Sequence, residues 1–363
     1  MYKLFNFLSI RKTQILFASD SHSTLDGNFK FIYSEIKRQN LKVDCKFILK
    51  DSINQKKTIK EIFLLAYYMA TSRFILIDDF YPMVYPLKIR KGADLIQVWH
   101  AVGAFKKFGF SRGKLPGSTI HSALYHKNYT KVIVSSKNVV EHYAEGFGVS
   151  SDKVIPIGVP RTDVFYDQMF KQTTAKDLYK RFSIPKDKKV ILFAPTFRGE
   201  GQSTAYYPFE KLNFHLLYEK LKDDYIFLIK MHPFVKEKVE IPLKYKGFFL
   251  DVTTYPEINE LLFITDLLIT DYSSVCFEFA LFNKPMLFFA FDLEEYKNER
   301  DFYYDYNSFI PGKLVRNSKE IVECINTELF LMEKIKPFVD YFYDYKDGNS
   351  SERFVEEVIK KYI

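Results

Sequence analysis

The sequence is short of the residues that stabilise or anchor several classes of protein. It contains only three cysteines, Cys45, Cys276 and Cys324, too few and too widely spaced for a disulfide framework or a paired metal motif. No apolar run reaches the roughly 18–20 residues that cross a bilayer, and the short apolar stretch 4–10 lacks a signal-peptide cleavage pattern. These absences argue against a disulfide-stabilised or membrane-spanning protein and favour reduced, buried thiols.

What is present is the composition of an ordinary globular protein. Hydrophobic residues make up 47% and charged residues 27% of the 363, which excludes disorder as the main state. The length exceeds that of one typical domain, so we expect two domains of similar size. An aromatic share of 18% supplies enough apolar area for large cores, a sticky surface, or both.

The positive charge lies in one half of the chain. Residues 1–165 hold 25 Lys and Arg against 13 Asp and Glu, a net charge of +12, whereas the remainder has a net charge of −4. Such an excess suggests nucleic acid, an anionic membrane surface or a phosphate-bearing substrate as partner. A nucleic-acid-binding protein is therefore the non-enzymatic alternative, although the chain has no compact Lys/Arg-rich segment or recognisable binding module.

Short apolar runs alternate with helical patterns along the chain. Runs that are apolar on both faces predict parallel strands covered by helices. The pattern stops near 161–174 and restarts, which predicts an α/β fold of the GT-B kind: two doubly wound, Rossmann-like domains, residues 1–168 and 169–363, facing each other across a cleft. The last helix, which runs to Ile363, could return to the N-terminal domain. Expected strands are Gln14–Ala18, Val43–Leu49, Phe74–Ile77, Asp94–Val98, Lys131–Val134, Val154–Ile157, Lys189–Ala194, Tyr225–Lys230, Gly247–Leu250, Leu267–Thr270 and Pro285–Phe289. Helices are expected in the gaps between the strands, for example Asn28–Asn40, Thr58–Thr71, Val139–Phe147, Ala175–Phe182, Ile258–Phe263 and Ser274–Phe282.

A histidine stands at one of the expected strand ends. Ligands of open parallel sheets bind beyond the carboxyl ends of the strands, and His100 directly follows the strand that ends near Val98. A histidine there can act as a general base near neutral pH. Lys106 and Lys107 follow in a glycine-containing loop and could bind an anion. The structural alternative is a histidine packed beside Trp99 in a basic loop.

Three further strand ends carry polar side chains. Arg161 follows a Gly-x-Pro turn at the expected domain junction, and arginine suits bidentate contacts with phosphate. Thr196 and Arg198 leave the first strand of the second domain, and His232 follows the next one. Taken singly, each has a structural alternative: a surface pair of Arg161 with Asp163, an ordinary strand exit, and a histidine satisfied by its surroundings.

The segment Thr270-Asp-Tyr-Ser-Ser274 has the most specific pattern. A strand ends in Thr270 and Asp271, and Ser273 and Ser274 precede an apolar helix, so hydroxyls and free backbone N–H groups could hold a phosphate. Glu278 stands one helical turn after Ser274 and could reach a ribose. An N-cap that binds nothing explains the serines, but not the clustering of such features at five strand ends.

Together these motifs resemble the CDP-glycerol glycerophosphotransferase family of teichoic acid synthesis, over nearly the whole chain. The most specific segments are the Trp99-His100 loop, 135–161, Ala194-Pro-Thr-Phe-Arg198, His232-Pro233 and Thr270-Asp-Tyr-Ser-Ser274. Family polymerases usually read Trp-His-Gly-Thr-Pro at the first motif, whereas this chain reads Trp-His-Ala-Val-Gly. That difference and the length favour a primase that adds the first glycerol phosphate. A further departure is Arg300-Asp301-Phe, where the resemblance leads us to expect Arg-Gly-Phe or Arg-Gly-Tyr.

The resemblance implies a GT-B fold and a role for each motif. His100 would take the proton from the acceptor hydroxyl, which attacks the β-phosphorus of CDP-glycerol and displaces CMP. His232 is the second catalytic candidate. The remaining candidates would bind the donor: Arg161, Thr196, Arg198, Thr270, Asp271, Ser273, Ser274 and Glu278. Because the chain has no Asp-x-Asp, the metal–diphosphate device of another glycosyltransferase architecture, we expect no metal and no cofactor.

The resemblance also implies the partners and the location. The acceptor would be a lipid-linked disaccharide on undecaprenyl diphosphate. The protein would bind it as a peripheral (monotopic) protein at the cytoplasmic face of an anionic membrane. A homo-oligomer is a further possibility. The apolar start of the chain is either an amphipathic surface segment or a first helix packed on its own domain. The alternatives are a polymerase that uses CDP-glycerol or CDP-ribitol for teichoic acid or capsule, and a transferase that uses a nucleotide sugar.

Overall fold

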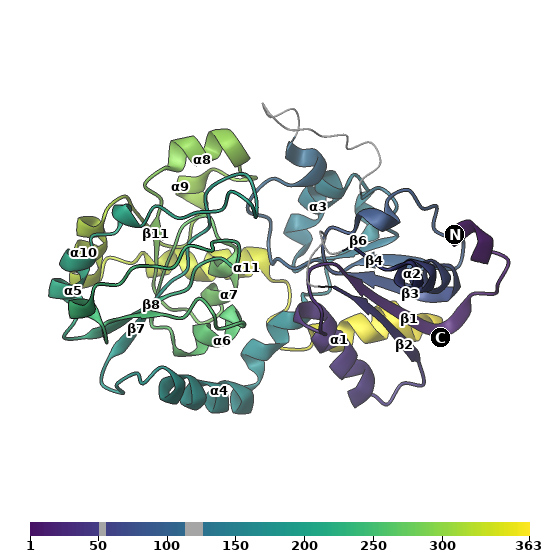
Figure 1. The fold of residues 1–363 in the computed structure, drawn as a ribbon, viewed down its shortest axis with the longest axis horizontal. Helices are drawn as coiled ribbons and strands as arrows, with labels where there is room; N and C mark the ends of the chain where they lie inside the picture. The colour runs from purple at the N-terminus through teal and green to yellow at the C-terminus, as the bar shows by residue number, and fades with distance from the viewer. Residues whose placement is uncertain (51–55, 113–125) are drawn as a thin grey trace. The chain divides into compact units, whose positions relative to one another are not determined.

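The computed structural model describes residues 1–50, 56–112 and 126–363 (Figure 1). The chain divides into two compact units, and each contains a six-stranded sheet in which every neighbouring pair of strands is parallel. The first unit comprises Met1–Tyr166 together with Tyr341–Ile363, and the second comprises Asp167–Asp340. The predicted α/β fold with two doubly wound sheets is therefore confirmed.

The sheet of the first unit has the strand order β2-β1-β3-β4-β5-β6. The order reverses between β1 and β3, because the chain builds one edge with β2 and then crosses back to extend the other. Its strands are β1 (Arg11–Ser19), β2 (Asp44–Leu49), β3 (Ser72–Ile77), β4 (Asp94–Gln97), β5 (Lys131–Ile133) and β6 (Val154–Ile155).

The helices of this unit are α1 (Gly27–Arg38), α2 (Ile59–Thr71), α3 (Val140–Phe147) and α12 (Ser350–Phe354). Thr58 begins α2 with a full capping box, since its hydroxyl accepts from the Glu61 N–H and the Glu61 carboxylate accepts from the Thr58 N–H. The N-terminal segment forms a short 3-10 turn, Tyr2–Phe5, in which Tyr2 is buried while Leu4 and Phe7 are exposed. The segment therefore packs on its own unit with one side, and its role as an amphipathic surface segment stays a prediction.

The C-terminal segment returns to the first unit and lies beside α1 (Figure 1). After α12 it continues as a π turn (Val355–Ile359) and a 3-10 turn (Lys360–Tyr362), not as the single helix expected. Phe354, Val355, Val358 and Ile359 complete the core under β1 and β3. Gly158 lets it approach, since a Cβ there would lie 2.4 Å from the Ser350 Oγ and the φ of Gly158 is +92°.

The sheet of the second unit has the order β12-β11-β10-β7-β8-β9 and reverses between β7 and β10. This is the strand order typical of dinucleotide-binding folds. The strands are β7 (Lys189–Phe193), β8 (Tyr225–Ile229), β9 (Phe249–Asp251), β10 (Leu267–Thr270), β11 (Met286–Phe289) and β12 (Lys313–Val315). β12 was not predicted.

The helices of the second unit are α4 (Gln168–Arg181), α5 (Phe214–Leu221), α6 (Ile258–Leu261), α7 (Val275–Ala280), α8 (Leu293–Arg300), α9 (Tyr306–Phe309), α10 (Ser318–Asn326) and α11 (Ile335–Phe342), whose last residues belong to the first unit. The expected helix at 175–182 begins seven residues earlier, because Asp167 caps the N–H of Phe170. Helix α4 therefore fills the region expected to be a break.

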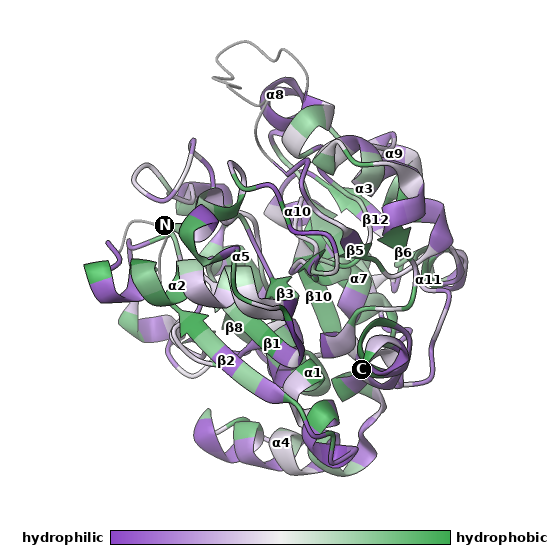
Figure 2. Ribbon diagram, turned by 90° about the vertical axis from the view of Figure 1, so that its right-hand side faces the viewer, coloured by the Kyte–Doolittle hydropathy of each residue, from purple (hydrophilic) through white to green (hydrophobic). Residues whose placement is uncertain are grey.

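Both sheets are buried on their two faces. Every residue of β4, β10 and β11 is buried, as expected for parallel strands that helices cover. Figure 2 shows the difference between buried strands and an exposed helix: β1, β3 and β8 are coloured mainly as hydrophobic and α4 mainly as hydrophilic. Within the described part of the chain, no helix has both the length and the apolar character needed to cross a bilayer.

Candidate functional site at the two sheet edges

Each sheet has a candidate binding edge at the point where its strand order reverses. Open parallel sheets bind ligands beyond the carboxyl ends of the strands at this point, because the two flanking loops diverge there. In the first unit the flanking loops follow β1 and β3, and in the second they follow β7 and β10. The motifs chosen from the sequence lie in or beside these loops, and each unit is described here by itself.

In the first unit a hydrogen bond crosses the reversal point. Ser21, after β1, donates to the Asp79 Oδ2 after β3 at 2.7 Å, and the Phe80 N–H donates to Oδ1 at 2.7 Å. The His100 Nδ1, after β4, lies 3.5 Å from the same Oδ1. The histidine predicted as a base is therefore paired with a carboxylate whose own position is fixed.

His100 is partly open to solvent, with 49% of its side chain accessible. Desolvation by the surrounding protein lowers the pKa of the imidazole, Asp79 raises it, and Arg161 lowers it further. The net direction is downward, so the ring is neutral at physiological pH and can accept a proton. The neighbouring Asp78 is buried, and desolvation raises its pKa to about 6.

The loop that carries His100 is held in an unusual conformation. Trp99 has a φ of +51°, in the left-handed region that costs energy for residues other than glycine. Gln97 Oε1 accepts from the Trp99 N–H at 2.9 Å, and the Asn28 Nδ2 donates to the carbonyls of Val98 and Trp99 at 2.9 and 2.8 Å. The Trp99 ring lies against that of His100, with centroids 4.3 Å apart. The packing expected as a structural alternative is thus present together with the accessible ring.

Lys106, Lys107 and Arg161 are the other candidate site residues of this unit. Lys106 and Lys107 are both half-buried in the loop after β4. The backbone N–H of Arg161 donates to the Asn28 Oδ1 at 2.9 Å, so one amide side chain ties the Arg161 turn to the His100 loop. Asp163 accepts from the N–H groups of Ser350 and Ser351, at 2.8 and 2.7 Å, and so anchors the C-terminal segment.

In the second unit a buried carboxylate joins the two loops at the reversal point. Asp271 Oδ1, after β10, accepts from the N–H of Thr196, after β7, at 2.7 Å and from that of Tyr272 at 2.5 Å. Thr270 donates its hydroxyl to the carbonyl of Ala194 at 2.8 Å. These bonds hold the two predicted motifs together as one rigid edge.

Arg198 completes this edge from within. Its guanidinium lies 2.9 Å from Asp271 Oδ2, donates to the Thr196 carbonyl at 2.7 Å, and pairs with Asp292 through a hydrogen bond of 3.0 Å. Only 7% of the Arg198 side chain is accessible. The rings of Tyr207, Tyr272, Phe291 and Tyr296 surround its charge at 5.1–5.7 Å, within cation–π range. Desolvation lowers the pKa of the Arg198 guanidinium, but Asp271 and Asp292 raise it by more, so the group stays charged.

Ser273 and Ser274 differ in how they cap α7. The Ser273 Oγ accepts a long hydrogen bond from the Val275 N–H at 3.5 Å, whereas Ser274 stands at the N-cap but makes no side-chain capping bond. Thr196 is 4% exposed, and its Oγ1 has no hydrogen-bond partner in the described part of the chain. The purely structural N-cap interpretation is therefore not supported for Ser274. Glu278 is 1% exposed, so its contact with a ribose stays a prediction.

His232 has a defined orientation after β8. Its Nδ1 accepts from the Phe234 N–H at 3.1 Å, and its ring lies between those of Phe197 and Phe234, at 4.8 and 4.6 Å. Because Nδ1 accepts, the proton of the neutral ring is on Nε2. His232 therefore presents a hydrogen-bond donor, which suits a phosphate oxygen better than it suits proton abstraction.

Asp301, which stands where the resemblance led us to expect glycine, has a backbone conformation that suits glycine. Asp301 has φ +46° and ψ +161°, a conformation that glycine adopts far more easily. Arg300 donates to the carbonyl of Gly199 at 2.7 Å and so ties this loop to the Thr196–Arg198 loop. At Gly199 the φ is +96° and a Cβ would lie 2.2 Å from the Thr204 carbonyl oxygen, so this tight turn requires glycine.

Sequence reasoning missed several residues of these edges. Ser21 and Asp79 follow the expected strands at 14–18 and 74–77, so the strand-end rule would have found them. Asp292 follows the expected strand at 285–289 in the same way, although its partner Arg198 is 94 residues away along the chain. Asn28 carries no such signal, because it lies in a helix and its partner is 71 residues away. Their contacts exist only after folding.

The family model for CDP-glycerol:poly(glycerophosphate) glycerophosphotransferase matches residues 1–360. The chain belongs to this family. It is 54% identical, over 99% of its length, to the teichoic acid poly(ribitol-phosphate) polymerase of Bacillus spizizenii, and it spans 58% of that protein. It is 35% identical over 98% of its length to the teichoic acid ribitol-phosphate primase of the same species, of which it spans 93%.

The fold has a counterpart among solved structures. The structure of the wall teichoic acid polymerase TagF superposes with a TM-score of 0.80 at 23% identity, over 99% of this chain and 92% of that one. The predicted GT-B type of fold is thereby confirmed.

Proposed function

We propose that this chain is the phosphotransferase core of a teichoic acid ribitol-phosphate polymerase. In this proposal it transfers ribitol phosphate from CDP-ribitol to a hydroxyl of a lipid-linked acceptor and releases CMP. The observation that carries the proposal is the 54% identity to a ribitol-phosphate polymerase over 99% of the chain, against 35% to a ribitol-phosphate primase. The polymerase alternative is thus better supported than the glycerol-phosphate primase that we expected first.

His100 is the proposed general base. Its depressed pKa keeps it neutral, and with Nδ1 facing Asp79 its Nε2 lone pair is left to take the proton of the acceptor hydroxyl. The oxygen then bonds to the β-phosphorus, the bond from that phosphorus to the bridging oxygen breaks, and CMP leaves with the electron pair.

The edge of the second unit is the proposed donor site. His232 would donate from Nε2 to a phosphate oxygen, and the hydroxyls of Thr196, Ser273 and Ser274 would add further donors. Arg161, in the first unit, remains a separate candidate for a phosphate contact. Arg198 and Asp271 are bonded mainly to each other and to the backbone, so their proposed role is to position these groups. Lys106 and Lys107 remain candidates for the acceptor's diphosphate.

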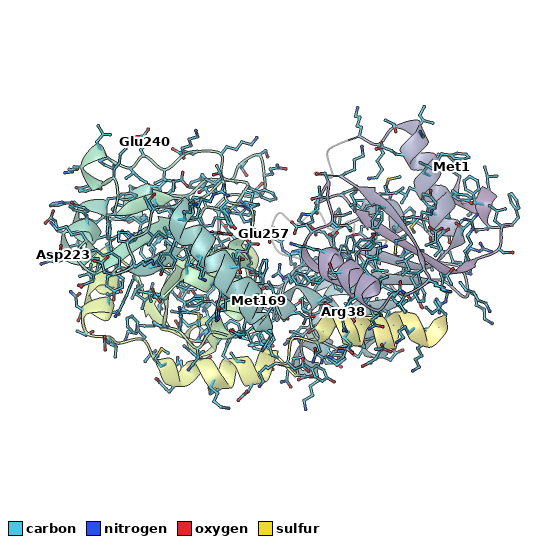
Figure 3. All side chains as sticks on the ribbon, turned by 90° about the horizontal axis from the view of Figure 1, so that it is seen from below. Met1, Arg38, Met169, Asp223, Glu240 and Glu257 are labelled. Atoms are coloured by element: carbon cyan, nitrogen blue, oxygen red, sulfur yellow. The ribbon has the colours of Figure 1, made fainter. Side chains whose placement is uncertain are left out.

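The proposed location is the surface of an anionic membrane. The N-terminal turn and α2 pack on each other through the rings of Phe5 and Phe63. Both elements expose apolar residues, with accessible fractions of 54% for Met1, 69% for Leu4, 82% for Phe7, 84% for Ile59 and 50% for Phe63. Met1 stands at the outside of this unit in Figure 3. The exposed cations among them are Lys3, Arg11, Lys12, Lys56 and Lys60. Apolar side chains with basic neighbours suit an anionic bilayer surface.

An assay with two donors and two acceptors tests the function. Purified protein receives CDP-ribitol or CDP-glycerol, with a lipid-linked disaccharide that either carries a first alditol phosphate or lacks it, and CMP and product length are measured. We expect rapid CMP release and long products from CDP-ribitol on the primed acceptor. Faster turnover of CDP-glycerol, or a single addition to the unprimed acceptor, would restore the primase interpretation, and no CMP from either donor would overturn the proposal.

Vesicle sedimentation tests the location. Binding to phosphatidylglycerol-containing vesicles, but not to phosphatidylcholine alone, should weaken in the Leu4→Asp/Phe7→Asp variant. Met169 and Leu243, exposed by 80% and 78% in the second unit, supply the matched control when both are changed to Asp. Figure 3 labels Met169 on α4. Equal binding of both variants would contradict a membrane surface on the first unit.

A further inference from the structure

Asp79 belongs to none of the motifs chosen from the sequence, and its surroundings are specific. It follows β3 at the reversal point of the first sheet, beside β1 and two strand positions from β2. Its Oδ2 accepts from Ser21 and its Oδ1 from the Phe80 N–H, both at 2.7 Å, and its own carbonyl accepts from the Gln97 side chain at 3.1 Å. With bonds to both carboxylate oxygens and the carbonyl, the group has little freedom to turn away.

His100 lies on the open side of this carboxylate. The distance from Nδ1 to Oδ1 is 3.5 Å, and 31% of the Asp79 side chain is accessible. That distance is longer than an ordinary N–H···O hydrogen bond, so the attraction is mainly between charges. It grows when the ring is protonated, which is the state that proton transfer from an acceptor hydroxyl creates.

The other groups around the ring act in both senses. Arg161 and His22 disfavour a charged imidazole, whereas the Asp78 backbone accepts a hydrogen bond from the ring and favours it. Of the two groups that stabilise the imidazolium, Asp79 has the larger effect. The same interaction keeps the proton of the neutral ring on Nδ1, which leaves Nε2 as the acceptor.

We infer that Asp79 is the positioning residue of His100: it selects the ring orientation that exposes the Nε2 lone pair and stabilises the imidazolium once the acceptor's proton has been taken. This inference rests on the proposed function for its catalytic consequence. The physical part, the pairing of Asp79 with His100, holds independently of which alditol is transferred.

The test combines a titration with kinetics on the full chain. The imidazole signals of the protein are followed by NMR as pH changes, and His100→Gln identifies the His100 signal. Asp79→Asn keeps the shape but removes the charge, so the His100 pKa should fall by roughly 0.5–1, and the acidic limb of kcat/KM should move down equally. kcat should fall by about 10- to 100-fold with KM nearly unchanged, and Asp79→Glu should restore part of it.

Two further variants keep the result interpretable. Asp152→Asn removes an exposed carboxylate of the same unit and should leave both the titration and the rate as in the unchanged protein. Ser21→Ala frees one carboxylate oxygen without removing the charge, and it serves if Asp79→Asn does not fold; it should lower kcat about threefold to tenfold through looser orientation.

Each outcome decides one part. A His100 pKa that is the same in Asp79→Asn and Asp152→Asn overturns the pairing, even in a protein with no transferase activity. A shifted pKa with unchanged kcat overturns the positioning role. Loss of activity in the unchanged protein with every donor defeats the proposed function alone, because the titration still decides whether Asp79 pairs with His100.

Discussion

The two sheet edges use charge in different ways. At the edge of the first unit, His100 is half-accessible and two carboxylates and a second histidine lie near it, so small changes of environment alter its protonation. At the edge of the second unit, Arg198 is almost fully buried between Asp271 and Asp292 and is surrounded by aromatic rings. The first arrangement can exchange a proton near neutral pH, whereas the second keeps its charges fixed.

If the proposed function is correct, the first edge carries out the chemistry and the charges of the second edge position the groups around them. Open groups with pKa values near neutrality are suited to proton transfer, and their loss should affect rate more than stability. Buried, paired ions have the opposite character, because removing one partner leaves the other charged and unsolvated. Four substitutions test the contrast, from the largest expected effect to the smallest.

Removal of the proposed base should give the largest effect. His100→Ala should lower kcat by roughly 10²–10⁴-fold, because the acceptor hydroxyl loses its proton acceptor, while the unfolding midpoint stays within a few degrees of the original. CMP release and thermal unfolding measure the two effects. His142→Ala, on α3 of the same unit, is the control. Turnover within about tenfold of the original would mean that His100 is not the base.

Arg198→Met should mainly affect stability. Asp271 is 0% and Asp292 13% accessible at the side chain, and both would lose their partner, at a cost of about 3–5 kcal/mol in the free energy of unfolding. Urea unfolding measures it. The exposed Arg316→Met supplies the comparison, with an expected change below about 0.5 kcal/mol. Equal stability of the two variants would show that the second edge is not locked by its ion pairs.

Asp78→Asn should stabilise the protein in a pH-dependent manner. Desolvation raises the Asp78 pKa to about 6 from an unfolded value of 3.8, so the folded state binds the extra proton between these values. Stability that is present below pH 4 is therefore lost as pH rises through 6. Removing the charge should recover up to about 3 kcal/mol at pH 8 and little at pH 4. Urea unfolding at both pH values checks this, and an equal gain at both would contradict it.

Asp301→Gly should have the smallest effect, a gain of at most about 1 kcal/mol. Glycine removes the backbone strain that the positive φ imposes on Asp301. Two effects oppose this gain: the 2.8 Å hydrogen bond from the Phe302 N–H to the Asp301 carboxylate is lost, and glycine increases the entropy of the unfolded chain. Asp305→Gly is the counterpart, because its φ of −63° is unstrained and its side chain caps the Ser308 N–H. That variant should be slightly less stable than the original. A loss of stability at both positions would argue against strain at Asp301.

The sheets could be predicted from the sequence because their strands are apolar on both faces. β12 was missed because three residues that begin with Lys313 make too weak a pattern. Helices α5, α8, α10 and α11 were also missed; the hydrophilic α8, for example, buries only Leu293 and Tyr296. The start of α4 depends on the side-chain cap of Asp167, and such boundaries are set by single hydrogen bonds.

Part of the candidate site could also be predicted, because several of its residues directly follow strands. His100, Thr196 and Asp271 stand directly after strands, and the position of a strand end is a local property. The partners that define their chemistry are not local: Asp292 reaches Arg198 across 94 residues, and Asn28 reaches Arg161 across 133. The exposure of His100 and the burial of Arg198 likewise appear only in the folded units.

The return of residues 341–363 to the first unit has a consequence for the order of synthesis on the ribosome. The second unit is continuous in the chain, so it can fold as soon as it has emerged. The first unit lacks Phe354, Val355, Val358 and Ile359 of its core until the second has been translated. At typical elongation rates this leaves its apolar surface uncovered for roughly 10–40 s, a period in which that surface is open to aggregation.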